Sequence, residues 1–432
     1  MKNTAENIFT TIILVIIAIV MSFVFFYSNI SISTLSGWEK IFADFMMIYL
    51  LFVLIRTVVL VAFSFGEYFF RKSLKEPSEF PIVSIIMPCY NEEKVVEAAI
   101  NSVANLDYPN YEVLVVDDGS TDLTLQTAKK LESKAKVRII SQENGGKSAA
   151  LNRGISEAVG EYVLCMDADS VLNKNVLKLA MSYFERKPNL AAVAGSVVLG
   201  NTDMILTQLQ KLEYIIGLNF HKTAQSFLNM VTIIPGPIGV FRRDILLKIG
   251  GYHHDTFAED CDLTIRLLVE GYDLAYCPEM IATTEAPEDL RSLIGQRYRW
   301  SRGITQAIVK NSHWLFKPHV NFRNFSLMTY MTLESIIIPL MNFSLAYITI
   351  EHALIYGADR LMGPFFASLT LLDMVLALYS VISEKQQFKL LLLAAISRVT
   401  YGLALEVLRF YCLIDEFFKI PMNWGKLVRR GL

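Results

Sequence analysis

The sequence carries two carboxylates one residue apart, Asp167 and Asp169, directly after an apolar run of strand-forming residues. Side chains two positions apart on a strand point to the same side, so both carboxylates can turn toward one point where the strand ends. Such hard oxygen ligands suit Mg²⁺ or Mn²⁺, which substrate phosphates and water often complete. An Asx turn is the plain alternative for so short a motif. A second acidic pair, Asp117 and Asp118, follows another apolar run and favours a nucleotide–metal site.

The apolar runs before these acids belong to a regular pattern. The runs span residues 82–88, 111–120, 137–142 and 161–170. The segments at their ends read PCYNEE, DDGSTD, ENGGKSAALNRG and DADS, and helix-like stretches lie between the runs. Alternating β and α segments predict a mainly parallel sheet, which binds its ligands beyond the carboxyl ends of the strands. Four polar strand ends in succession therefore predict one binding site.

The segment GGKS at 145–148 contains part of a phosphate-binding P-loop. The full motif needs a glycine five positions before the Gly-Lys pair, where this chain has Ser141, and it should follow the first strand of the fold. A P-loop is therefore excluded. Lys147 is still expected beside a strand end, where its ammonium can pair with phosphate charge.

Glu259 and Asp260 lie in the segment AEDCDLT, just before an apolar pattern with helical spacing. Acids in this place can simply stabilise the helix N-terminus through its dipole. Alternatively, one of them can act as a general base that takes the proton of an attacking hydroxyl. The periodicity alone leaves both interpretations open.

A basic and aromatic motif, QRYRW, lies shortly before the chain becomes strongly apolar. A Pro-Glu-Asp run ahead of it predicts a helix start. On that helix Gln296 and Trp300 are four residues apart and share a face with Arg299. Arg297 and Arg302 are expected to point elsewhere, where binding of lipid headgroups is an alternative. The motif is predicted to lie where a donor pyrophosphate, an acceptor and the membrane meet.

The N-terminal part of the chain contains two apolar stretches, 8–27 and 41–65. The first has twenty residues without a charge, which is about the length that spans a bilayer and longer than the apolar core of a signal peptide. Three basic residues follow the second stretch, and the positive-inside rule places them in the cytoplasm. The N-terminus and the middle of the chain are therefore expected on the cytoplasmic side.

Three further candidate spans, 325–350, 362–383 and 390–413, follow the polar middle of the chain. They contain ionisable residues, which are costly in lipid and usually face a helix bundle or an aqueous path. These residues are Glu334, Asp373, Arg398 and Glu406. They can pair with one another or line a translocation path. Three spans would put the basic C-terminal tail outside, against the positive-inside rule, so one of them can be interfacial.

The composition excludes several classes of protein. Apolar residues make up 53% of the chain, and the mean hydropathy of +0.39 reflects the apolar ends. Lys and Arg total 40 against 42 Asp and Glu, a balance that argues against nucleic-acid binding. The five cysteines are odd in number and form no CxxC pair, so they indicate neither a disulfide framework nor a zinc site.

Taken in order, DDGSTD, DADS, AEDCDLT and QRYRW resemble the D, D, D, QxxRW signature of processive family 2 glycosyltransferases, over about 81–314. That family includes cellulose, chitin, hyaluronan and poly-N-acetylglucosamine synthases. The segments CYNEE, NGGKSAALNRG and GVFRRDILLKIGGY look most like the bacterial poly-β-1,6-N-acetylglucosamine synthases of biofilm exopolysaccharide. The resemblance implies a Rossmann-like α/β domain of the GT-A fold at 77–314, between transmembrane helices in 1–76 and 315–432.

The resemblance also implies an activity and a place in the cell. The implied enzyme is a processive, inverting hexosyltransferase that polymerises a UDP-sugar, foremost UDP-GlcNAc, and translocates the product. It would be a multi-pass protein of the bacterial cytoplasmic membrane with its catalytic domain in the cytoplasm. The implied cofactor is Mg²⁺ or Mn²⁺. The implied partners are the donor, the growing polysaccharide, the bilayer and a small membrane subunit, with no nucleic acid.

Carried over residue by residue, the resemblance assigns roles to four groups of residues. Donor binding falls to Pro88, Tyr90, Glu92, Asp117, Asp118, Lys147 and Asp167. The metal falls to Asp169 and Asp167, and the base is Asp260 with Glu259 beside it. The acceptor and pyrophosphate end falls to Gln296, Arg297, Arg299 and Trp300. Ile304 stands where relatives often have a glycine, which leaves the local acceptor geometry open.

Three alternatives stay beside this prediction. A non-processive family 2 transferase would add one sugar to a lipid acceptor. A synthase of another polymer, such as hyaluronan, cellulose or a chitin-like chain, would share the same motifs. A transporter or channel with a nucleotide-sensing domain would also have charged spans, although a sensor needs no base placed like Asp260.

Overall fold

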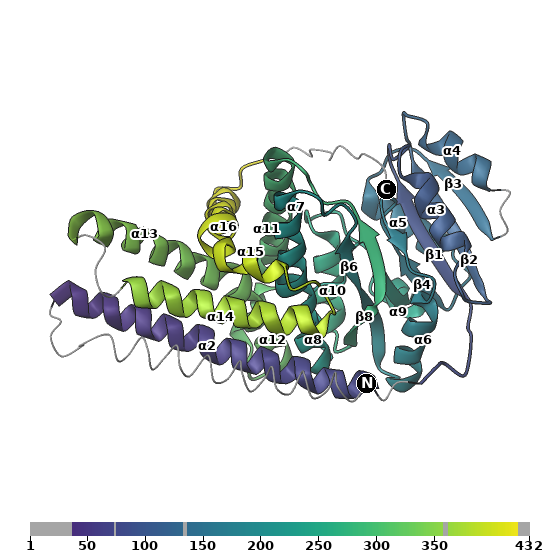
Figure 1. The fold of residues 1–432 in the computed structure, drawn as a ribbon. Helices are drawn as coiled ribbons and strands as arrows, with labels where there is room; N and C mark the ends of the chain where they lie inside the picture. The colour runs from purple at the N-terminus through teal and green to yellow at the C-terminus, as the bar shows by residue number, and fades with distance from the viewer. Residues whose placement is uncertain (1–36, 73–74, 133–135, 357–361, 422–432) are drawn as a thin grey trace.

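The computed structural model describes residues 37–72, 75–132, 136–356 and 362–421 (Figure 1). These residues form an α/β domain and a group of long apolar helices beside it. Helix α2 (Gly37–Lys72) precedes the α/β domain in sequence, and the helices from α12 (Phe322–Thr332) onward follow it. The first expected span, 8–27, lies outside the described residues.

The α/β domain is built on an eight-stranded sheet, counted over the described residues, with the order β3-β2-β1-β4-β7-β6-β8-β5. The first four strands pair in parallel, whereas β7 runs antiparallel to both β4 and β6. The strands are β1 (Val83–Cys89), β2 (Tyr111–Asp118), β3 (Val137–Gln142), β4 (Tyr162–Cys165), β5 (Val171–Leu172), β6 (Leu190–Leu199), β7 (Gly239–Arg242) and β8 (Asp273–Thr284). The predicted mainly parallel sheet is confirmed for the first four strands. The fourth predicted run contains β4 and the turn after it, and β5 begins just beyond its end.

Helices cover both faces of the sheet. Residues of α3 (Val96–Ala104), α4 (Thr124–Leu131) and α6 (Val176–Arg186) pack in one core. Residues of α5 (Lys147–Glu157), α9 (Arg243–Lys248) and α10 (Glu259–Val269) pack in the other. Four further elements connect this domain to the long helices: α7 (Ile205–Glu213), the π-helix η2 (Tyr214–Phe220), α8 (His221–Phe227) and α11 (Leu290–Lys310).

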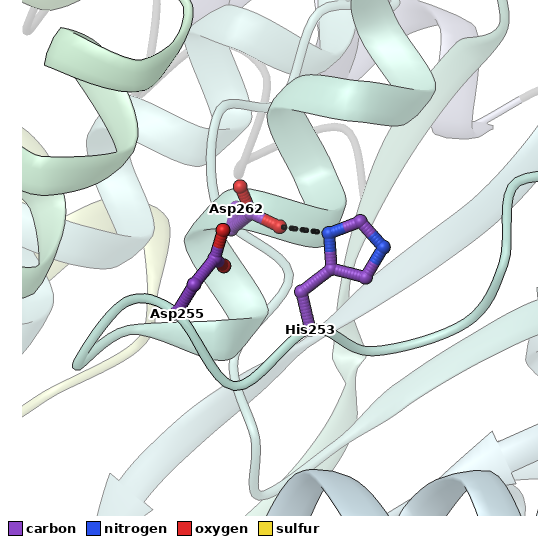
Figure 2. Close-up of side chains that lie close together, drawn as sticks. All are labelled: His253, Asp255 and Asp262. Carbon is purple, nitrogen blue, oxygen red and sulfur yellow. Dashed lines mark ion pairs between the residues drawn. The ribbon is translucent and has the colours of Figure 1, made fainter.

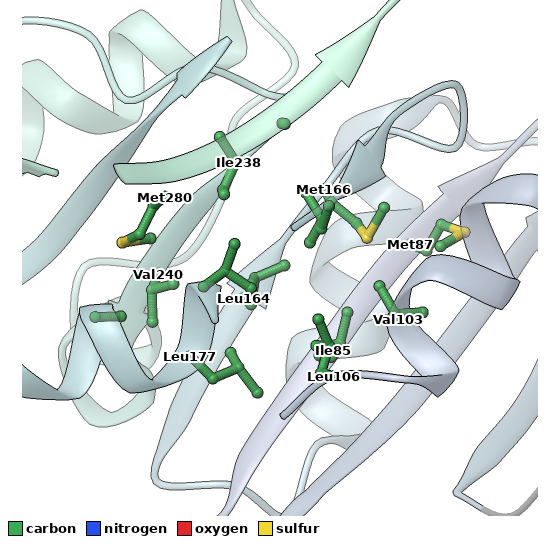
Figure 3. Packing of buried hydrophobic residues seen from close by; sticks show 14 of the residues in the cluster. Ile85, Met87, Val103, Leu106, Leu164, Met166, Leu177, Ile238, Val240 and Met280 are labelled. Atoms are coloured by element: carbon green, nitrogen blue, oxygen red, sulfur yellow. The ribbon is translucent and has the colours of Figure 1, made fainter. Parts of the chain in front are cut away.

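The alternation of side chains along β1 explains why the sheet has two cores. Ile85 and Met87 pack with α3 and α6, as Figure 3 shows, while Ile86 between them faces α5. Gly154 of α5 lies so close to the sheet that an added Cβ would stand 2.4 Å from Ile86 Cγ2. The glycine therefore brings α5, and with it the strand-end loop that begins the helix, tightly against β1.

Four helices in the described part of the chain are long and apolar enough to cross a membrane. They span Lys40–Arg71, Phe322–Ile355, Met362–Ser383 and Leu390–Phe417. The second region contains α12 and α13 (Ile338–Tyr356), and the third is α14 (Met362–Ser383). The fourth contains α15 (Leu390–Ser397), a short π-helix and α16 (Leu403–Phe417). All four correspond to stretches that the sequence predicts.

The ionisable groups in these helices pair with one another. Arg56 Nη2 lies 2.5 Å from Glu334 Oε2, and Arg398 Nη2 donates to Asp373 Oδ1 at 2.7 Å. Glu406 pairs with Arg409 one turn later, at 3.0 Å. The pairing interpretation is therefore confirmed for Asp373 with Arg398 and for Glu334 with Arg56, whereas Glu406 pairs within its own helix. Arg56 and Glu334 come from α2 and the π-helix after α12, so their pair joins helices from both ends of the chain.

Replacing Glu334 with Gln should destabilise the helix assembly by about 3 kcal/mol, because it leaves the Arg56 guanidinium without its counter-charge in a mostly buried place. The double change Arg56→Leu with Glu334→Leu should restore much of that stability, since no lone charge remains. Thermal unfolding of the purified protein in detergent measures both effects. Glu351→Gln on an exposed part of α13 is the matched control. Equal loss in the single and double variants would contradict the pairing argument.

Candidate functional site

The carboxyl ends of β1, β2 and β4 meet at one edge of the sheet, and their loops are fastened to each other. The backbone N–H of Asn91 donates to Ser120 Oγ at 3.0 Å, and the Thr121 N–H donates to Asn91 Oδ1 at 2.7 Å. Asn91 has a positive φ of 53°, which an asparagine tolerates better than most residues. The β1 loop, which also carries Tyr90 and Glu92, is therefore held at a fixed distance from the DDGSTD loop.

Asp118 holds the loop that leads into α5. Its carboxylate accepts hydrogen bonds from Gln142 Nε2 at 2.7 Å, from the Gly145 N–H at 2.9 Å and from the Gly146 N–H at 2.8 Å. Gly146 has a positive φ of 85°, which permits the tight turn before the helix. These bonds fix the position of Lys147, the first residue of α5. Sequence reasoning assigned Asp118 to the donor and did not find this positioning contact.

Asp117, the neighbour of Asp118, has a carboxylate oxygen that lacks a partner. Its side chain is 1% exposed, and Oδ1 has no hydrogen-bond donor within the described residues. Buried polar atoms are nearly always hydrogen-bonded, and an exception calls for an explanation. A ligand with an N–H or O–H group at this strand end would supply the missing donor.

Lys147 joins two acidic side chains from different elements. Its ammonium lies 2.6 Å from Asp167 Oδ1, at the end of β4, and 3.1 Å from Glu259 Oε1, at the start of α10. Burial alone would lower the pKa of Lys147, but the charges of Asp167 and Glu259 raise it, so the ammonium stays protonated. The predicted donor lysine, the first acid of DADS and the acids of AEDCDLT are therefore brought together.

Gly236 lies against this cluster, although the sequence analysis gave it no role. An added Cβ would stand 2.8 Å from Lys147 Nζ and 3.0 Å from Asp167 Oδ2. A side chain would consequently compete with the ammonium and the carboxylate for the same space. The one sequence signal is that Gly236 lies between two prolines, in the segment PGP ahead of β7.

Asp260 has the acid–base character expected of a base. Burial first, and then the charge of Glu259, raise its pKa from the usual 3.8 to about 6, while Lys147 opposes the shift. The backbone N–H of Cys261 donates to its Oδ1 at 2.8 Å and fixes its orientation at the start of α10. A carboxylate with a raised pKa accepts a proton more readily near neutral pH.

Asp167 and Asp169 are both half-buried in the turn after β4. The Ser170 N–H donates to the Asp167 carbonyl at 3.2 Å, and its hydroxyl donates to Asp169 Oδ1 at 3.2 Å. This turn presents two carboxylates beside Lys147 at the strand end. The donor set consists of hard oxygens, so its chemistry fits Mg²⁺ or Mn²⁺.

A second group of possible metal ligands, His253, Asp255 and Asp262, lies in and after the loop before α10 (Figure 2). The Lys310 ammonium already occupies its centre, 2.9 Å from Asp255 Oδ2 and 2.8 Å from Asp262 Oδ1. Arg266 adds a second positive charge, 2.8 Å from Asp262 Oδ2. This cluster is therefore neutralised by side chains, and it joins the loop before the base to the end of α11.

Helix α11 carries the QRYRW motif and starts where the sequence predicts, with Asp289 as the N-cap that accepts from the Ser292 N–H at 2.9 Å. The Arg297 guanidinium is 5% exposed, pairs with Glu213 at 2.7 Å, donates to Gln296 Oε1 and lies 4.4 Å from the centre of the Trp300 ring. The charge of Arg297 is thus used inside the protein, where it orients the side chains on either side of it.

The alternative that Arg297 and Arg302 bind lipid headgroups is wrong for both residues. Arg297 is buried against α7, and Arg302 is 2% exposed and pairs with Glu416 of α16 at 2.9 Å. Arg299 is half-buried beside Trp300 on the same helix and has further contacts of its own. Of the two arginines in QRYRW, Arg299 is therefore the better candidate for binding a ligand, because Arg297 is buried and paired with Glu213.

Comparison with known proteins identifies the family of the chain. Residues 84–250 match the sequence model of glycosyl transferase family 2. The chain is 30% identical over 290 residues to the poly-β-1,6-N-acetyl-D-glucosamine synthase of Staphylococcus epidermidis, covering 66% of this chain and 69% of that protein. It is 28% identical over 276 residues to the Staphylococcus aureus enzyme of the same name, covering 62% and 67% of the two chains. The chain belongs to glycosyltransferase family 2.

A solved structure shows the same fold. The mannosyltransferase of Pyrobaculum calidifontis, in complex with GDP-Man and Mn²⁺, overlays with a TM-score of 0.56 at 20% identity, covering 84% of this chain and 99% of that one. The glycosyltransferase therefore has the GT-A fold that the motif resemblance implied.

In this glycosyltransferase the helix α11 touches the loop that carries the base. An added Cβ at Gly303 would stand 2.5 Å from the Ala258 backbone nitrogen, so only a glycine fits there. Gln306 accepts from the Phe257 N–H at 3.0 Å and donates to Glu416 of α16 at 3.0 Å. Ile304 packs in the core beside α10. The close approach to the segment before Asp260 thus depends on Gly303. Ile304, which stands where relatives often have a second glycine, does not disturb this approach.

Replacing Gly236 with Ala should lower glycosyl transfer by about tenfold or more, because the new methyl group displaces the Lys147 ammonium from Asp167 and small misplacements in a site are costly. The lysine end is flexible, so the fold should remain intact by thermal unfolding. The measurement is the initial rate of sugar transfer from the donor.

Gly295→Ala is the matched control, since an added Cβ there meets nothing within 4 Å. Its rate should equal that of the wild type. Full activity in the Gly236 variant would show that the position of Lys147 is unimportant.

Proposed function

We propose that this chain is a membrane-embedded, inverting polymerase that transfers N-acetylglucosamine from UDP-GlcNAc to a growing exopolysaccharide. The observation that carries the proposal is the similarity to the poly-β-1,6-N-acetyl-D-glucosamine synthases, which extends over 66% of the chain and beyond the matched family domain. The arrangement of Lys147, Asp167 and Asp260 at one strand edge supports it, since it supplies a charged donor site and a base.

The donor nucleotide binds at the ends of β1 and β2 in this proposal. Asp117 accepts an N–H or O–H of the nucleotide on its unpartnered oxygen. Tyr90 is 42% exposed and lies with Pro88 and Glu92 at the end of β1, where it can contact the nucleobase or the ribose of the donor. Asp118 acts by fixing the loop before α5.

The pyrophosphate lies toward Lys147 and the turn after β4. Asp169 and Asp167 would hold a divalent cation, which when bound neutralises charge that develops on the departing pyrophosphate. The Lys147 ammonium contributes positive charge at the same place, and it keeps Asp167 at a fixed position. The mannosyltransferase of similar fold was solved with Mn²⁺, which supports the choice of a divalent cation.

The transfer itself is a single displacement. Asp260 takes the proton of the acceptor hydroxyl while its oxygen forms a bond to the anomeric carbon of the donor sugar. The bond between that carbon and the pyrophosphate oxygen breaks, and UDP leaves with the electron pair. One base on the face opposite to the leaving group is enough, so the configuration inverts. Glu259 holds Lys147 and raises the pKa of Asp260 by its charge.

The acceptor lies at helix α11, where Trp300 can stack on the terminal sugar and Gln296 and Arg299 contribute polar contacts. Arg297 positions Gln296 and Trp300 from inside the protein. In this proposal the site lies next to the bacterial cytoplasmic membrane, with the catalytic domain on the cytoplasmic side and a small membrane subunit as a partner. The four helices that are long and apolar enough to cross a membrane support this proposal. The charges of the apolar helices are paired with each other, so in this proposal other groups line the path of the polymer.

Purified protein in detergent, given radiolabelled UDP-GlcNAc with Mg²⁺ or Mn²⁺, should yield a ladder of products on a gel. Digestion with linkage-specific glycosidases should then degrade the ladder. A panel of other UDP-sugars serves as the control, and each should give less product. One added sugar on lipid would contradict polymerisation and favour a lipid-acceptor transferase.

Transfer should depend on pH through Asp260. Its carboxylate must be ionised to act as a base, so kcat/KM should fall as the pH drops through about 6 and level off above it. With the usual pKa of 3.8 the activity would persist to much lower pH.

Asp260→Asn should reduce transfer by about a hundredfold or more while UDP still binds, since only the proton acceptor is lost. Isothermal titration with UDP and initial rates from pH 5 to about 8 measure the two effects. Asp255→Asn, which changes an exposed carboxylate on the loop before α10, is the control. Retained turnover in the Asp260 variant would mean that another group is the base.

A further inference from the structure

Lys222 is a buried cation that the proposed mechanism does not use. It lies on α8, is 6% exposed, and its ammonium makes neither a hydrogen bond nor an ion pair with the described residues. Its one close neighbour there is the ring of Tyr276, 5.7 Å from the ammonium. An isolated buried charge is expensive, so such a group is normally paired. The missing partner is therefore expected to come from a ligand.

The charges around Lys222 connect it to the active site. The carboxylates that act on its ammonium are those of Asp260, the proposed base, and Glu384, which follows α14. Burial lowers the pKa of Lys222 to about 8, and both carboxylates oppose this shift, so the ammonium remains mostly charged at neutral pH. The ammonium therefore lies within electrostatic reach of the proposed base and of Glu384.

Asn219 provides a second unpartnered group one turn before Lys222. Its side chain is 1% exposed, and its Nδ2 donates to Glu384 Oε2 at 3.3 Å. That bond orients the amide, and its Oδ1 has no donor among the described residues. Residues three apart on a helix lie on neighbouring parts of the same face. A buried amide oxygen without a donor and a lysine without an ion pair among the described residues therefore lie one helical turn apart.

The element that carries these groups also reaches the QRYRW helix. Tyr214 begins the π-helix η2, and its ring centre lies 6.3 Å from that of Trp300. Asn219 belongs to the same π-helix, and Lys222 follows in α8. π-helical turns are frequent at functional sites. One continuous segment therefore leads from the tryptophan of the proposed acceptor site to Asn219 and Lys222.

We infer that Lys222 and Asn219 form a polar subsite for the acceptor sugar, on the helical segment whose first residue packs against Trp300. The ammonium donates to hydroxyl and acetamido carbonyl oxygens of the sugar, and the Asn219 amide oxygen accepts from a hydroxyl or N–H group. The chemistry that this subsite recognises is an uncharged, N-acetylated sugar with both kinds of polar group. The inference rests on the proposed function, since it names the residues that hold the acceptor for the same base.

The subsite predicts a separation between acceptor binding and donor binding. Lys222→Met removes the charge and keeps most of the side-chain volume, so the fold should tolerate it. The KM for a short N-acetylglucosamine oligosaccharide acceptor should rise by about tenfold or more, as expected for the loss of a hydrogen bond from a charged group. The affinity for UDP and the rate of UDP release without added acceptor should stay within about twofold. Asn219→Ala should raise the same acceptor KM by a smaller factor.

Lys211→Gln is the matched control, because Lys211 is another partly buried lysine near Glu384, on the preceding helix α7. Its acceptor KM should equal that of the wild type, and Lys222→Arg should recover part of the acceptor affinity that Lys222→Met loses. An unchanged acceptor KM in Lys222→Met would overturn the inference. If Lys222→Met lost both UDP binding and acceptor turnover, the inference would be overturned as well, because Lys222 would then have a structural role.

The same assays separate this inference from the proposed function. If wild-type protein turns over UDP-GlcNAc and extends the oligosaccharide, the proposed function stands, and the variants then decide the subsite. If the wild type turns over no UDP-sugar at all, the proposed function fails, and the acceptor subsite fails with it.

Discussion

The site depends on one ammonium group between two carboxylates. Lys147 begins α5, Asp167 ends β4 and Glu259 begins α10, and these residues are far apart in the sequence. Without the ammonium, the two carboxylates would repel each other, and both would repel the nearby carboxylate of Asp260. The lysine makes this concentration of negative charge possible, so a donor pyrophosphate, a divalent cation and a base can share one edge of the sheet.

Several unusual backbone positions serve to place that ammonium. Asp118 fixes the loop in front of α5 through three hydrogen bonds, Gly146 permits the turn, and Gly154 lets the helix approach β1 closely. Gly236 leaves room for the ammonium on the other side. A large part of the polar sequence at these strand ends therefore acts on the geometry of the site, and a smaller part is left to touch the ligand.

Sequence reasoning recovered the elements whose signal is local. The parallel strands, the start of α11 at Asp289 and the meeting of Lys147 with Asp167 follow from periodicity and from the rule that strand ends form the site. It did not recover Gly236, the contact of Gly303 with Ala258 or the pair of Asn219 and Lys222. These depend on how segments distant in sequence approach each other, and a glycine or a lysine has no periodicity that reports such an approach. Arg297 shows the same limit, because its partner Glu213 lies on another helix.

The hydrogen bonds of Gln306 have a consequence for how the enzyme can be taken apart. This side chain binds Phe257 in the loop of the base and Glu416 in the last apolar helix, and Arg302 beside it binds the same glutamate. The segment that precedes Asp260 is therefore held in part by the last apolar helix. A fragment cut after the QRYRW helix would keep every proposed catalytic residue but lose the support on which their alignment rests. The catalytic unit of this enzyme is larger than its α/β domain.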